Sequence, residues 1–406
     1  MIRVLLACSL VWACLALSPL SRAGAADPAA GSPYGVALTT GVADFRDPSR
    51  CLRALELAGA AGIRWVRISM AWSWIEPNPG RFTWTAHDAL VDGARRHGME
   101  VLGTLGFTAV WNSTAPPEVT RAVDRERYPP QDYQAWGRYV YETAAHFRGR
   151  VRYWQVWNEP DLGGNGPFGF WRGSEPEFAR LLAVAYESVK RADPEAQVVL
   201  GGLSLGGSPG VLNRDFLPAI LHDPAYPAAR YFDVLDFHHY GPAAEAKRRY
   251  DYVQAELAKA GAAGRPVWVT EVGSPSNETG REPPEYAGPE GQARYLREMV
   301  PYLLSLGVAR VFWFTLFDTP VVGPQFDRHG LLDETLAPKP AYDAYRDLIA
   351  SATPPVQAGE DGPEQGGAGP GESAEGGRLW LAAAVGAGAA VAGGTAFARR
   401  RRAGRR

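Results

Sequence analysis

Two glutamates lie where short apolar runs of the sequence end, and their placement suggests acid–base chemistry. Glu159 closes the run Tyr153–Glu159, and Glu271 closes the run Val267–Glu271. Cleavage of a glycosidic bond requires two such carboxyl groups at one gap, because one protonates the leaving oxygen while the other attacks the anomeric carbon or activates water. An ion pair at a rim explains one such glutamate equally well, but two at matching positions favour the catalytic hypothesis.

The elements that would carry these glutamates follow from the alternation of short apolar runs with amphipathic stretches between Tyr34 and Ile349. That alternation predicts βα units and a parallel sheet. We expect helices starting at Asp47-Pro48 and spanning Ala86–His97 and Tyr133–Phe147. Eight strands are expected, at Tyr34–Leu38, Trp65–Ser69, Glu100–Leu105, Tyr153–Trp157, Gln197–Gly201, Val234–His239, Val267–Thr270 and Val311–Thr315. Eight strand–helix units in about 315 residues indicate an α/β fold, the (β/α)8 TIM barrel.

An open, doubly wound sheet is the alternative, but no glycine-rich phosphate loop follows the first strand. In a barrel, the long connections 107–130, 160–175, 272–290 and 317–339 all emerge at the face where the carboxyl ends of the strands meet. Glu159 and Glu271, which end the fourth and seventh strands, would then lie opposite each other across the central cavity.

Several of these runs together resemble glycoside hydrolase clan A, whose members include families 5, 39 and 42. The resemblance extends from Tyr34 to about Leu348, and families 39 and 5 look nearest. The runs that carry it are Trp65-Val66-Arg67-Ile68-Ser69, the segment 74–84, Trp157-Asn158-Glu159-Pro160, His238-His239-Tyr240, Trp268-Val269-Thr270-Glu271 and Val311-Phe312-Trp313-Phe314. Family 39 xylosidases usually carry an accessory β-sandwich, which has no counterpart in this sequence, and this departure speaks against a xylosidase.

The resemblance implies roles for the residues that end the fourth and seventh strands. Glu159 would be the acid/base, Asn158 would bind the sugar 2-hydroxyl and Glu271 would be the nucleophile. Glu159 would have to carry a proton before cleavage, whereas Glu271 would have to be ionised. Carboxyl groups on these two strands should lie about 5–5.5 Å apart, which predicts retention of the anomeric configuration.

Four further positions match the clan and have physical reasons of their own. Arg67 is cationic, and a nearby cation favours the ionised form of a carboxylate, which suits a nucleophile. His238 and Tyr240 are two residues apart and so point to one side of a strand, where Tyr240 could hydrogen-bond the nucleophile, while His239 points away and is expected to pack. Trp313 would floor the sugar site with its flat apolar face, although a core tryptophan is the alternative.

Other residues at strand ends and on the long connections are candidates for additional sugar contacts, with packing an equal alternative: Trp72, Trp111, Asn112, Phe168, Phe170, Trp171, Tyr286, and the acids Asp161 and Asp318. The seven histidines and three cysteines show no metal-ligand spacing, so we expect neither a metal nor a cofactor. Cys51 is expected to be a small buried apolar residue.

The two ends of the chain predict export and anchoring. Residues 1–25 are typical of a signal peptide, with Ala23-Gly24-Ala25 as the cleavage site and an uncleaved anchor as the alternative. A catalytic domain is expected at 26–351 and a disordered linker rich in glycine, proline and glutamate at 352–377. A single transmembrane helix at 378–398 and a basic cytoplasmic tail at 399–406 would follow, which places the barrel outside the cell. No Leu-Pro-x-Thr-Gly motif supports the alternative of a cleaved sorting signal.

The leading hypothesis is a retaining β-glycoside hydrolase that acts on an oligo- or polysaccharide. The alternatives are a non-catalytic carbohydrate-binding barrel on the cell surface and a transglycosylase of envelope glycan. An aldolase would need a lysine or a metal cluster at the strand ends, and neither is present. Nine arginines lie in the leader and the tail, where no acidic residue balances them, so the segment between carries a net charge of -2 - 9 = -11, which argues against nucleic acid as a ligand. No obligate protein partner is evident.

Overall fold

The computed structural model describes residues 31–40, 42–163, 169–206, 213–278, 283–319 and 328–352. All of them lie in the first of the chain's two units, Met1–Pro354. The predicted signal peptide at 1–25, the membrane helix at 378–398 and the tail at 399–406 lie outside the described residues, as does the linker at 352–377 apart from Ala352, which ends the last described helix. Within the described ranges, no helix combines the length and the apolarity that crossing a bilayer requires.

The eight predicted strands close into a parallel barrel in chain order, β1-β2-β3-β4-β5-β6-β7-β8, with β8 pairing back to β1. Their bounds are β1 Tyr34–Leu38, β2 Trp65–Met70, β3 Glu100–Leu105, β4 Tyr153–Val156, β5 Gln197–Leu203, β6 Val234–His239, β7 Val267–Val272 and β8 Arg310–Trp313. The prediction of a TIM barrel is therefore confirmed, and the alternative of an open doubly wound sheet is wrong.

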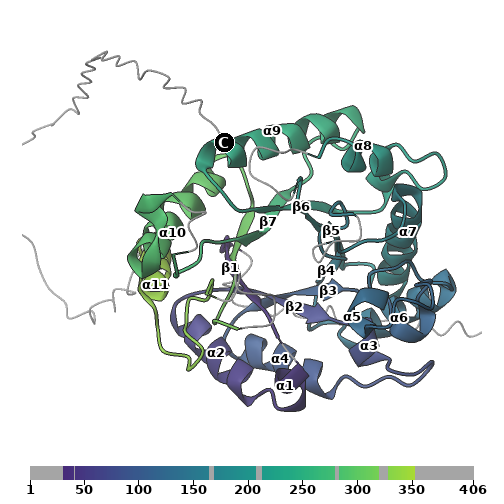
Figure 1. Ribbon diagram of the computed structural model, residues 1–406, viewed down its shortest axis with the longest axis horizontal. Coiled ribbons are helices and arrows are strands. Elements are labelled where there is room, and N and C mark those ends of the chain that lie inside the picture. The colour runs from purple at the N-terminus through teal and green to yellow at the C-terminus, as the bar shows by residue number, and fades with distance from the viewer. Residues whose placement is uncertain are drawn as a thin grey trace, which may run out of the picture. The chain divides into compact units, whose positions relative to one another are not determined.

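Helices surround the barrel on the outside (Figure 1). They are α1 Val42–Arg46, α2 Ser49–Ala60, α3 Trp72–Ile75, α4 Thr85–Arg96, α5 Ala122–Arg125, α6 Tyr133–His146, α7 Glu175–Ala192, α8 Phe216–Leu221, α9 Ala243–Lys259, α10 Gly288–Ser305 and α11 Pro340–Ala352, with short 3₁₀ turns η1 Val110–Asn112, η2 Ala228–Arg230 and η3 Pro284–Tyr286. The sequence sets some of these boundaries: Ser174 and Glu177 form a capping box that starts α7, and Asp47 accepts a hydrogen bond from the amide of Ser49 at the start of α2.

The amino-terminal half of the barrel interior is filled with apolar side chains. Six of them, buried to 97% or more, form one cluster that Tyr153 joins at its edge; the six are Trp65, Leu102, Val199, Val234, Trp268 and Phe312. We call this set the lower aromatic cluster. Its rings meet mostly edge to face, with the centroids of Trp65 and Trp268 5.4 Å apart, an arrangement that aromatic pairs favour.

Successive inward side chains on a strand are spaced by two residues, so a second layer of the interior lies two residues further along. Six polar side chains point inward here: Arg67 on β2, Gln155 on β4, Asp236 and His238 on β6, and Thr270 and Glu271 on β7. We call these six residues the upper polar layer. It lies at the face where the long strand-to-helix connections begin, so the barrel presents its charged groups where a ligand can enter.

Candidate active site

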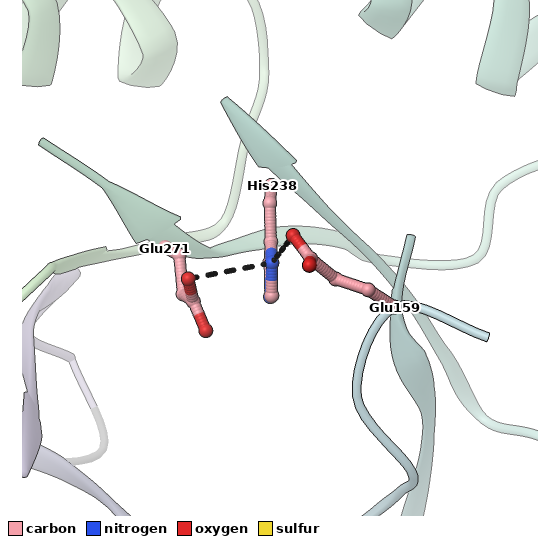
Figure 2. Close-up of side chains that lie close together, drawn as sticks. All are labelled: Glu159, His238 and Glu271. Carbon is pink, nitrogen blue, oxygen red and sulfur yellow. Dashed lines mark hydrogen bonds and ion pairs between the residues drawn. The ribbon is translucent and has the colours of Figure 1, made fainter. Parts of the chain in front are cut away.

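The side chains of Glu159 and Glu271 converge at the carboxyl end of the barrel, with His238 between them (Figure 2). One oxygen of each carboxylate and one ring nitrogen of His238 all lie within 4.8 Å of one another. His238 Nδ1 is 2.9 Å from Glu159 Oε1 and 3.5 Å from Glu271 Oε2. The two carboxyl groups predicted from the sequence are thus brought to one gap, at a spacing nearer to that of retaining glycosidases than to that of inverting ones.

The backbone after β4 aims Glu159 at this gap. Trp157 and Glu159 both adopt left-handed conformations, with φ of +75° and +46°, which residues other than glycine seldom do. The amide of Glu159 is held by a 3.0 Å hydrogen bond to the carbonyl of Gly202 on β5. Strained backbone of this kind is concentrated at functional sites, where the surrounding structure enforces it.

A strand irregularity aims Glu271. Trp268 and Thr270 face the interior, so strict alternation would turn Glu271 outward. The register between β6 and β7 shifts between Phe237 and His238, and that between β7 and β8 shifts between Val269 and Val272. These shifts allow Glu271 to face inward beside Thr270, as bulges next to active sites commonly do.

Glu271 is held in its ionised form. Arg67 Nη1 donates to Glu271 Oε1 at 2.6 Å, and the hydroxyl of Tyr240 donates to Oε2 at 2.7 Å. Burial would raise the pKa of Glu271, but the positive charges of His238 and Arg67 and the Tyr240 hydrogen bond outweigh it, so this pKa lies below its usual value. Arg67 Nη2 also donates to Asn158 Oδ1 at 2.6 Å, which ties the segment after β4 to the same arginine.

His238 and His239 face opposite sides of β6, as their spacing predicts. Burial would lower the pKa of His238, but the negative charges of Glu271 and Glu159 outweigh this effect and raise it. His239 contacts the carbonyl of Gly241 at 3.0 Å, and burial lowers its pKa to about 3, in keeping with a packing role.

The prediction that Trp313 floors the sugar site is wrong. Its side chain is fully buried in the core, and its indole N–H donates to the carbonyl of His329 at 2.9 Å. Phe312 belongs to the lower aromatic cluster, so alternation turns Trp313 outward and Phe314 inward. Phe314, which directly follows β8, has its ring centroid 6.2 Å from that of Tyr240, whose hydroxyl donates to Glu271.

Most of the other loop candidates are structural. Trp72, Asn112 and Trp171 are buried. Asp161 accepts hydrogen bonds from the amides of Ser204 and Leu205, and burial raises its pKa to about 6. Asp318 pairs with Lys339 at 3.0 Å. Trp111, Phe170 and Tyr286 are half-buried, and Phe168 lies outside the described residues.

Three interior residues and one glycine that the sequence reasoning did not single out support the site. Gln155, Asp236 and Thr270 lie beneath His238 and Arg67 and are fully buried. Asp236 is the residue two before His238, so alternation on β6 already pointed to it. Gly202 leaves room for the His238 ring, because a Cβ at this position would lie 2.0 Å from Nε2.

The group Glu159, His238 and Glu271 has donor atoms close enough to ligate a metal ion. Both oxygens of Glu271 already accept hydrogen bonds, from the guanidinium of Arg67 and the hydroxyl of Tyr240. A cation at this place would lie beside the positive charge of Arg67. The donor set therefore fits an acid–nucleophile pair better than a metal centre.

Comparison with known proteins agrees with this geometry. Residues 66–201 match the model of glycosyl hydrolase family 10, and residues 144–345 match that of the glycosyl hydrolase catalytic core. A β-xylosidase from Caldicellulosiruptor saccharolyticus is 38% identical over 77 residues, which are 17% of this chain and only 15% of that relative's length.

Two solved structures share the fold. A monomeric β-xylosidase from Caulobacter crescentus CB15 superposes with a TM-score of 0.61 at 19% identity, covering 79% of this chain and 68% of that one. A GH5_18 protein from Streptomyces cattleya, in complex with Manb1-4GlcNAc, gives a TM-score of 0.61 at 21% identity, covering 80% of this chain and 82% of that one. The family matches relate the chain to glycoside hydrolases, and the two structures share its (β/α)8 barrel fold.

Proposed function

We propose that the chain is a retaining β-glycoside hydrolase acting on an oligo- or polysaccharide, with Glu159 as acid/base and Glu271 as nucleophile. The observation that carries this proposal is the convergence of the two carboxylates within 4.8 Å, one hydrogen-bonded to His238 and the other to Arg67 and Tyr240. The different partners suit different tasks, because the cation and the phenol favour a charged nucleophile while the histidine can exchange a proton with an acid.

The reaction would run in two displacements. An oxygen of Glu271 attacks the anomeric carbon while Glu159 gives its proton to the departing oxygen, which leaves a glycosyl ester on Glu271. Ester formation removes the charge of Glu271 from the gap. Glu159, now ionised, takes a proton from water as that water attacks the ester, and the free acid form of Glu159 is restored with the sugar released in its original configuration.

The test uses the full-length protein on a panel of aryl β-glycosides and polysaccharides. Glu271→Ala should lose turnover, and azide should restore it with an α-glycosyl azide as product, because azide replaces the missing nucleophile in one inverting step. Glu159→Ala should instead yield the β-glycosyl azide, since azide then attacks the glycosyl ester. Glu285→Ala, which removes an exposed glutamate, is the matched control and should behave as the wild type.

Two outcomes would contradict the assignment. Full activity in Glu271→Ala would remove Glu271 from the mechanism. Sugar binding by the wild type without any turnover on the panel would instead favour the non-catalytic carbohydrate-binding barrel, and transfer of the sugar to another sugar rather than to water would favour the transglycosylase.

We also propose that the barrel acts outside the cell and is held at the membrane. The apolar run with a small-residue cleavage site at 1–25 and the uncharged segment 379–398 followed by four arginines support this proposal. A chain shortened to residues 1–377 should appear in the culture medium, whereas the full chain should remain with the membrane fraction. Equal release of both chains would exclude the anchor.

A further inference from the structure

A buried carboxylate lies beneath the two catalytic candidates and is not used by the mechanism above. Asp236 on β6 is fully buried in the barrel interior. Its Oδ1 accepts a 2.9 Å hydrogen bond from the amide of Thr270, and its Oδ2 accepts from the hydroxyl of Thr270 at 2.5 Å and from the side-chain amide of Gln155. A carboxylate in such a place is costly unless every partner is fixed, so its contacts determine which way the surrounding protons point.

The orientation of the Gln155 amide follows from Arg67. Gln155 Oε1 lies 2.7 Å from Arg67 Nε and 2.7 Å from Thr104 Oγ1. A guanidinium has no acceptor, so the atom that faces Arg67 must be the amide oxygen. The amide nitrogen of Gln155 therefore faces Asp236 and Thr270 and donates to both, at 3.0 Å in the case of Thr270 Oγ1.

Only one hydrogen-bonding role then remains for the hydroxyl of Thr270 toward His238, that of acceptor. It has a single proton, which it donates to Asp236, and two lone pairs, one of which accepts from Gln155. The remaining contact of this hydroxyl is with His238 Nε2, at 3.2 Å. Because the hydroxyl proton is already used, Thr270 can only accept here, and His238 Nε2 must be the nitrogen that carries a proton.

We propose that Asp236 is a positioning residue that acts through the hydroxyl of Thr270 to keep the ring proton of His238 on Nε2, so that Nδ1 can exchange one proton with Glu159. This inference rests on the proposed function only for its catalytic meaning. Nδ1 lies 2.9 Å from Glu159 Oε1. When His238 is neutral, Glu159 can hydrogen-bond its bare Nδ1 only in the protonated form, which is the form that cleavage requires.

The ring of His238 cannot escape this arrangement by moving toward β5. Gly202 leaves a space that the ring fills, with the position of a Cβ only 2.0 Å from Nε2. The charged groups that face the ring are Glu159 from the segment after β4, Glu271 from β7 and Arg67 from β2, with Asp236 reached through Thr270. These contacts come from the protein's own side chains, so they preorganise the position of the proton.

The test is nuclear magnetic resonance of the full-length protein labelled with ¹⁵N-histidine, with the His238 signals assigned by their loss in His238→Asn. As the pH is raised, the imidazole should lose its proton from Nδ1 and retain it on Nε2. In Thr270→Val the acceptor is gone, and the neutral ring should populate the form protonated on Nδ1. Thr270→Ser keeps the hydroxyl and should restore the wild-type spectrum.

Turnover provides the second readout. Thr270→Val should lower kcat by roughly 10–100-fold with little change in KM, by analogy with the loss of a partner that orients a metal-ligating histidine. Thr270→Ser should recover most of this loss. If Thr270→Val does not fold, Asp236→Asn gives the same test, because an amide that donates to Thr270 Oγ1 frees the hydroxyl proton for His238.

The outcomes separate this inference from the proposed function. A wild-type ring that is neutral with its proton on Nδ1, or a proton that stays on Nε2 in both Thr270→Val and Asp236→Asn, would overturn the role of Asp236. A wild-type protein without turnover would contradict the proposed function, but the tautomer of His238 would still be measured and would still decide the inference.

Discussion

The lower aromatic cluster and the upper polar layer share the strands β2, β6 and β7, where a residue of the cluster lies two positions before a residue of the layer. Trp65 is followed by Arg67 on β2, and Trp268 by Thr270 on β7. The first member of each pair is surrounded by apolar side chains, and the second by hydrogen-bond partners. The comparison shows that one alternating pattern separates stability from site formation. Burial of apolar area stabilises the barrel at one end, and oriented polar groups fill it at the other.

Replacement of Glu159, which contacts the upper polar layer through His238, should therefore reduce the rate without reducing stability. Glu159→Gln should lower kcat by about 10²–10⁴-fold, the usual contribution of a general acid, on substrates whose leaving group needs a proton. The midpoint of urea unfolding should not fall. Aryl glycosides with very acidic leaving groups are the control, because their first step should be far less affected; an equal loss on both substrate types would show that Glu159 does not act as the acid.

Replacement of a residue of the lower aromatic cluster should instead reduce stability and leave the rate unchanged. Trp268→Ala should reduce the free energy of unfolding by about 3–5 kcal/mol, as for other buried aromatic residues truncated to alanine. Activity per folded molecule should be kept, and urea unfolding followed by circular dichroism measures the first effect. Val123→Ala, at an exposed position, is the control. A Trp268→Ala protein that is as stable as the wild type but inactive would break the division between the two layers.

Gly202 on β5 tests whether the position of the His238 ring in the upper polar layer matters for turnover. Gly202→Ala would place a Cβ 2.0 Å from His238 Nε2, so the ring must move away from Thr270 and Glu159. We expect kcat to fall roughly 10–100-fold, the range for the loss of an orienting partner. Gly31→Ala, where a Cβ would meet nothing within 4 Å, should leave kcat unchanged. Unchanged turnover in Gly202→Ala would mean that the ring position does not matter.

The smallest effect should be a shift in pH dependence. The Tyr240 hydrogen bond helps to keep the pKa of Glu271 below its usual value, so Tyr240→Phe should raise that pKa. A nucleophile is active when ionised, and activity is lost as the pH falls through its pKa. The acid limb of kcat/KM should therefore move to higher pH in Tyr240→Phe. A limb that stays in place, or moves to lower pH, would show that Glu271 is not the group that titrates there.

Alternation and strand-end motifs were enough to predict the barrel and its two glutamates. Three strands, at Tyr34–Leu38, Glu100–Leu105 and Val234–His239, have the predicted bounds, and the others differ by a few residues at their ends. The prediction for His238 and His239 succeeded because it used the alternation of β6. The prediction for Trp313 failed because it followed the family pattern and did not test it against alternation from Phe312.

Other parts of the site could not be predicted from the local sequence. The inward turn of Glu271 depends on register shifts against β6 and β8, which are properties of strand pairing rather than of the run Val267–Glu271. The contacts of Gln155 with Arg67 and Asp236 join three strands that are far apart in the chain. Spacing in one strand indicates which side a residue faces, but not which partner it meets.

The hydrogen bonds of the upper polar layer also determine how the barrel can be assembled. Arg67 and Gln155 come from the first half of the strands, and Asp236 and Thr270 from the second. The side-chain amide of Gln155 bonds to Asp236 and Thr270 across the two halves, and an isolated half-barrel would lose these partners, which is costly for a buried polar group. Fragments divided between β4 and β5 should therefore gain structure only when mixed, because only then does Gln155 meet Asp236 and Thr270.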